Sequence, residues 1–201
     1  MKLAKTLVTF GALVSLVACG QDNSVSKDKF CEEADKVEKH VYASAHATYY
    51  SNLKLSFSGF SEAEIKAMRE ELKKQGVEEG EQTVEMDFTW GDTGFSTTSE
   101  SKYAAQVTQL ISTTVQATAN SFKSASAEDL KGIKFYIKPF KVVETMDLSG
   151  QSITMTMQWN EFGYLASMTS KTKIKMTLDA GKTATINSED RFSFTYQDAA
   201  E

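Results

Sequence analysis

Apolar and polar residues alternate along much of the chain, and this alternation predicts half-buried β-strands. The clearest cases are residues 152–159, 171–178 and 192–196, where apolar side chains fall on one face and mostly Ser, Thr, Gln or Lys on the other. We predict further strands at residues 49–58, 84–90, 95–99, 133–137, 142–146 and 183–187. Short turn sequences separate most of them, so we expect an antiparallel meander. Pro139 disturbs the pattern and should mark a sheet edge or a bulge.

Three other segments have the spacing of amphipathic helices. The first begins after the N-cap Ser26 and ends around residue 43, and the second follows the capping-box pair Ser61 and Glu64 and ends before Gly76. Residues 101–122 fit either a helix or one face of a strand; their length without Gly or Pro favours the helix that we predict. The chain is therefore expected to form one α+β domain, in which a curved antiparallel sheet packs with two or three helices.

The N-terminal residues have the pattern of an export signal. Lys2 and Lys5 precede an apolar stretch, residues 6–17, which is shorter than the roughly twenty residues that a permanent membrane helix needs. The following Leu16-Val17-Ala18-Cys19 resembles the lipobox of bacterial lipoproteins. The resemblance implies that residues 1–18 are a cleaved signal peptide and that the thiol of Cys19 receives a diacylglycerol.

A lipidated Cys19 would hold the protein on a membrane outside the cytoplasm, because each buried methylene contributes about 0.8 kcal/mol. Residues 19–26 then form a lipidated tether with a reach of at most about 25 Å, and residues 27–201 form the single globular domain. Gly20 in place of an aspartate is compatible with an outer-membrane location if the cell has two membranes. The expected location is the cell envelope, with the membrane as one partner.

Composition and motifs narrow the function of the domain. The formal net charge of the full chain is −5. Without the two lysines of the leader, the chain has 20 basic and 27 acidic residues, a net charge of −7. This negative charge argues against nucleic acid as a partner. Cys31, the only other cysteine, is expected at the edge of the core. Gly181-Lys182-Thr183 lacks the first glycine of a phosphate loop, and His40 and His46 do not form a convincing metal site. We therefore expect a binding module without cofactor, metal or catalytic residues.

The methionines suggest what the domain binds, because methionine adapts to irregular apolar surfaces. The order of the elements, with Asn160-Glu161-Phe162-Gly163-Tyr164-Leu165, resembles bacterial lipoprotein carriers and their relatives, and the resemblance implies a half-barrel sheet around a cavity for acyl chains. Its lining would include Met86, Phe88, Trp90, Met155, Met157, Trp159 and Met176. The simpler interpretation is that these residues fill a solid core. In that case the protein would bind other envelope proteins through a sheet face or edge, and an uncharacterised enzyme is the third hypothesis.

Overall fold

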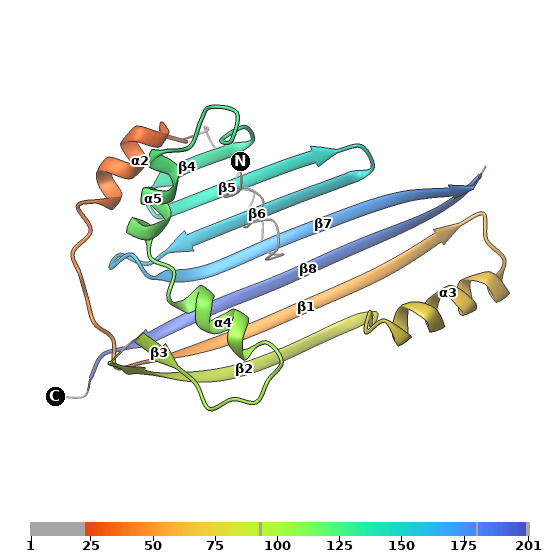
Figure 1. The fold of residues 1–201 in the computed structure, drawn as a ribbon, viewed down its shortest axis with the longest axis horizontal. Coiled ribbons are helices and arrows are strands. Elements are labelled where there is room, and N and C mark those ends of the chain that lie inside the picture. The colour runs from red at the N-terminus through yellow and green to blue at the C-terminus, as the bar shows by residue number, and fades with distance from the viewer. Residues whose placement is uncertain (1–22, 93, 180, 200–201) are drawn as a thin grey trace.

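The computed structural model describes residues 23–199 except 93 and 180, so the predicted signal peptide, Cys19 and most of the tether lie outside the described residues. It is an α+β fold with an open antiparallel sheet of eight strands and, in the described part, four helices (Figure 1). The helices are α2 (Lys27–Ala34), α3 (Glu62–Lys74), α4 (Ala104–Ile111) and α5 (Val115–Lys123). The strands are β1 (Ser44–Ser58), β2 (Gly80–Gly91), β3 (Gly94–Ser96), β4 (Ile133–Ile137), β5 (Phe140–Leu148), β6 (Gln151–Trp159), β7 (Leu165–Asp179) and β8 (Lys182–Gln197).

The sheet is not one continuous meander, and that part of the prediction is wrong. Its strand order is β3-β2-β1-β8-β7-β6-β5-β4, so the first long strand pairs with the last one (Figure 1). All of β1 from Ser44 to Ser58 is in register with β8, which places Tyr49 opposite Phe192. This pairing joins the meander β1-β2-β3 to the meander β4 to β8. It buries the apolar side chains of both central strands on the same face.

The helices α2, α4 and α5 cover about half of that apolar face (Figure 1). On the far half, α3 lies beside the end of β1, where Arg69 lies over the Phe57 ring. Under them, one cross-strand row is apolar on every strand from β2 to β4, and it consists of Val84, Tyr49, Phe192, Met168, Met157, Val142 and Phe135. The next row is largely polar, and we call it the polar row; it consists of Gln82, Ser51, Asp190, Ser170, Met155, Glu144 and Ile133. The polar row therefore marks where the helical cover ends.

The first helix is shorter than the sequence pattern predicts. The Ser26 side chain caps α2 by accepting a hydrogen bond from the backbone of Lys29, but the helix ends at Ala34 rather than around residue 43. Residues 35–43 instead cross the end of the sheet, where Ala43 donates to the backbone of Gln197 and accepts from that of Trp90. These backbone bonds hold the segment in place of a further helical turn, and they leave Val41 63% exposed.

The ambiguous segment 101–122 is helical, but it forms two helices instead of one. The break falls at the β-branched residues Thr113 and Thr114. Thr114 caps α5 by accepting a hydrogen bond from the backbone of Ala117, and it forms an isolated β-bridge with Tyr164. The change of direction lets α4 and α5 both place apolar side chains on the sheet.

Several strand boundaries also differ from the predicted ones. The strand predicted at 95–99 contains only Gly94–Ser96, and the two predicted at 183–187 and 192–196 are parts of the continuous strand β8. Pro139 lies in the turn between β4 and β5 at one edge of the sheet, where a residue without a backbone N–H disturbs no ladder. The predicted capping box of Ser61 and Glu64 is confirmed at the start of α3. None of the helices in the described part of the chain is long and apolar enough to cross a membrane.

Candidate functional site

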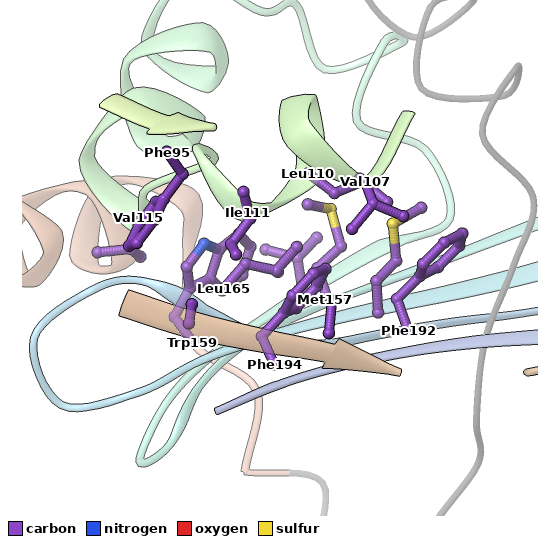
Figure 2. Close-up of a cluster of buried hydrophobic side chains, with 14 of the residues drawn as sticks. Phe95, Val107, Leu110, Ile111, Val115, Met157, Trp159, Leu165, Phe192 and Phe194 are labelled. Atoms are coloured by element: carbon purple, nitrogen blue, oxygen red, sulfur yellow. The ribbon is translucent and has the colours of Figure 1, made fainter. Parts of the chain in front are cut away.

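Five of the seven side chains predicted to line a ligand cavity lie in the hydrophobic core. Trp159 and Phe88 are fully buried, and the remaining three are almost so; they are Met86, Met155 and Met157. Figure 2 shows Val107 and Leu110 of α4 directed toward the sheet, where Met157 and Phe192 lie. The helices thus pack directly on these side chains. Only Trp90 and Met176 have substantial exposure, 40% and 38%.

Trp90 instead borders a cleft of about 420 Å³ at one end of the sheet. Four segments that are distant in the sequence form it: the chain after α2, the end of β2, the start of α5 and the turn between β6 and β7. We call this site the aromatic cleft, and its main side chains are Val37, His40, Val41, Trp90, Phe162 and Tyr164. Its volume lies within the range of about 300–1,000 Å³ that is usual for small-molecule sites.

The turn between β6 and β7 forms one wall of the aromatic cleft. The Asn160 side-chain oxygen accepts hydrogen bonds from the backbone N–H groups of Phe162 and Tyr164, at 3.1 and 2.9 Å, and its amide donates to Tyr42. Gly163 has a positive φ of 75°, and a Cβ there would lie 2.9 Å from a methyl carbon of Val115. Glycine is therefore required both for the turn and for its close packing against α5. Asn160 and Gly163 together fix where the two aromatic side chains point.

The segment after α2 forms the opposite wall and is tied to that turn. The ring of His40 stacks on Phe162, with centroids 4.3 Å apart and an angle of 21° between the planes. Tyr164 Oη donates to the His40 backbone oxygen at 2.7 Å, and the Gln116 amide donates to the Val37 oxygen at 3.1 Å. These contacts hold the segment although most of it has no regular secondary structure. The cleft is thus largely preformed.

The lining chemistry favours apolar contact over reaction. Aromatic and aliphatic groups form the walls, while Asp35, Lys39, Thr114 and Gln116 supply polar groups around them. Burial raises the pKa of Tyr164, and it raises that of Tyr42 against the opposing effect of the Asn160 hydrogen bond. Both phenols are therefore neutral hydrogen-bonding groups near pH 7. The arrangement can hold an apolar or aromatic molecule and hydrogen-bond to one polar end of it.

The remaining sequence predictions fall outside the aromatic cleft. Met176 lies on the far half of the apolar face, where Leu148 is also exposed; Leu178 is exposed at the register shift near the end of β7. Cys31, predicted at the edge of the core, lies within it: it is buried against α5, with its sulfur 3.5 Å from the Ala119 oxygen. Burial raises the pKa of the Cys31 thiol, which keeps it protonated near pH 7.

Sequence reasoning missed most of the aromatic cleft. The helix predicted to end around residue 43 includes His40 and Val41, and Phe162 and Tyr164 enter only through the segment that resembles lipoprotein carriers. The sequence contains one local sign of this site: Phe162 and Tyr164 flank the turn residue Gly163, and two aromatic side chains at a turn stay exposed unless another apolar segment packs against them. The identity of that segment depends on the tertiary fold.

No protein family, curated protein or solved structure matches the chain. The residues of the aromatic cleft must therefore carry the functional inference.

Proposed function

We propose that the protein is a membrane-anchored lipoprotein of the cell envelope that binds a hydrophobic ligand in the aromatic cleft without chemically changing it. The observation that carries this proposal is the cleft itself, with a volume of about 420 Å³ and an apolar, aromatic lining. Trp90 and Val41 are 40% and 63% exposed there, and large apolar side chains kept at a concave surface are typical of ligand sites. A ligand would cover both.

The position of the cleft suits a ligand that enters from a membrane. The chain is held to the sheet from Val25 onward, where its backbone N–H donates to the Phe135 oxygen at 2.8 Å. Helix α2 follows and is about 12 Å long, at 1.5 Å per residue. The segment that begins directly after it, with Asp35 and Val37, lines the cleft. A lipid on Cys19 would therefore keep the cleft close to the bilayer.

Ligand binding can be tested with the neutral apolar dye N-phenyl-1-naphthylamine, which becomes fluorescent in apolar sites. We expect the purified protein carrying Cys19→Ser to bind the dye, and Trp90→Ala to weaken binding about fivefold or more, because losing a partly buried aromatic contact costs about 1 kcal/mol. Val41→Asp should weaken it further by placing a charge in the cleft. The matched control is Leu178→Ala, which removes an exposed apolar side chain at the other end of the sheet. Equal affinity in all four proteins, or no binding by any, would refute the ligand proposal.

Membrane anchoring needs a separate test, because the ligand site and the anchor can fail independently. In cells that produce the protein, labelled palmitate should be incorporated into the parent chain and not into Cys19→Ser, and only the parent should sediment with membranes. A parent chain without label, or a variant that remains on membranes, contradicts the anchor. Neither result affects the dye assay.

A further inference from the structure

The polar face of the sheet, opposite α4 and α5, has a groove of about 260 Å³ that lies across four strands. Two neighbouring cross-strand rows form its floor: Asn52, Glu189, Lys171 and Thr154 in one, and Lys54, Asn187, Lys173 and Ser152 in the other. Three strand spacings of about 4.8 Å make it about 14 Å across. It can therefore hold an extended ligand, and we call it the polar groove.

The lysines give the polar groove a local positive charge. Lys54 and Lys173 flank Asn187 in one row, with their Cα atoms about 10 Å apart, and neither is ion-paired within the described part of the chain. Glu189 is already paired with Arg191 at 2.7 Å and with Lys171 at 3.7 Å. On this face around the groove, cations outnumber carboxylates by five to three: Lys54, Lys171, Lys173, Lys175 and Arg191 against Glu81, Asp147 and Glu189. Since the whole chain has a net charge of −5, this excess is local and favours an anion.

The uncharged side chains of the polar groove are suited to hydroxyl groups. Asn52, Asn187, Ser152 and Thr154 supply both donors and acceptors on strands β1, β8 and β6. The side-chain amide of Asn52 donates to Tyr50 and Glu81, while its Oδ1 is buried and accepts no hydrogen bond within the described residues. A ligand with several hydroxyls would match this mixture of donors and acceptors.

Two other anionic polymers fit the polar groove less well. The groove lies in the middle of the sheet, where the strands already pair with one another, so an acidic peptide could not add a strand to it. No aromatic side chain is among the described residues that line it, and single-stranded nucleic acid is usually bound by stacking on aromatics. Recognition must come from lysines, amides and hydroxyls. We propose that the polar groove binds an acidic oligosaccharide, at a site separate from the aromatic cleft.

The test is calorimetric titration of the protein carrying Cys19→Ser with three probes: hexagalacturonate, its neutral methyl ester and hexaglutamate. We expect hexagalacturonate to bind at least tenfold more tightly than the other two, with affinity that falls as salt is raised. The variant with Lys54→Gln and Lys173→Gln should lose at least tenfold in affinity for hexagalacturonate. The matched control is Lys66→Gln with Lys131→Gln, which removes the same charge from exposed positions outside the groove.

Each other outcome overturns the proposal. Absence of hexagalacturonate binding excludes the acidic sugar that the proposal names, and equal binding of the methyl ester shows that the lysines do not recognise a carboxylate. Equal binding of hexaglutamate points to an acidic peptide or to charge alone. An equal loss in the control variant shows that net charge, and not the polar groove, determines affinity.

Discussion

Phe30 is the residue that attaches the first helix to the sheet, and its removal should destabilise the whole domain. Its side chain is 0% exposed and packs against three rings, Phe135, Phe140 and Trp159, with centroids 5.2, 5.8 and 6.4 Å away. Replacing a buried Phe by Ala costs about 3–5 kcal/mol, and the aromatic contacts place Phe30→Ala in the upper part of that range. At about 2–4 °C per kcal/mol for a chain of this size, a loss of about 4 kcal/mol lowers Tm by about 8–16 °C.

The assay is thermal and urea unfolding followed by circular dichroism. Leu178→Ala is the control, since this side chain is 52% exposed and its loss should change the free energy of unfolding by no more than about 0.5 kcal/mol. The dye affinity of Phe30→Ala should also fall, because α2 holds the segment that contributes Val37 and Val41 to the aromatic cleft. A Tm decrease below about 3 °C would show that α2 does not contribute to the cooperative core, and it would refute this account of the fold.

Two further predictions concern single positions. Burial raises the pKa of Glu144, so the folded protein binds this proton more tightly than the unfolded chain does, and stability is lost as pH rises through the folded pKa. At about pH 7, Glu144→Gln should therefore unfold at a higher urea concentration than the parent. At about pH 3, the two proteins should unfold at the same urea concentration. A variant that is less stable than the parent at pH 7 contradicts this account of Glu144. Gly132→Ala should cost at least about 2 kcal/mol, because φ is +82° and a Cβ would overlap the Thr145 carbonyl oxygen. Gly76→Ala, with φ +80° and nothing within 4 Å of the added atom, should cost less in the same urea titration, and equal costs would show that the overlap is relieved.

The sequence pattern correctly predicted the strands and helix starts that depend only on neighbouring residues. The alternation at residues 152–159 reflects a strand with one buried face, and the capping box of Ser61 and Glu64 needs only residues within one helical turn. The break between α4 and α5 was not predicted, although its cause is partly local: Thr114 caps the second helix, but the bond from Val115 to the Gly163 oxygen depends on a distant turn. Helix boundaries set by such long-range bonds are not encoded in spacing.

The candidate sites depend even more on long-range contacts. Strand alternation marks Met86 and Met157 as buried, but it does not indicate whether helices or a ligand cover them, and here the helices do. The aromatic cleft combines Val41, Trp90, Gln116 and Phe162, which meet only because β1 pairs with β8 and the chain crosses the end of the sheet. The polar groove likewise needs the register between Lys54, Asn187 and Lys173. No sequence window contains these combinations.

The polar row divides the sheet into two parts that should exchange amide hydrogens by different routes. Strand segments under α4 and α5 lie beneath buried side chains, so their amides exchange only when the whole domain unfolds. The ends of the hairpins β5–β6 and β7–β8 lie beyond the helical cover, and local opening is sufficient for them to exchange (Figure 1). The polar groove lies against the second part and the aromatic cleft beside the first. Deuterium uptake would therefore distinguish which of the two sites is occupied, without any label on the ligand.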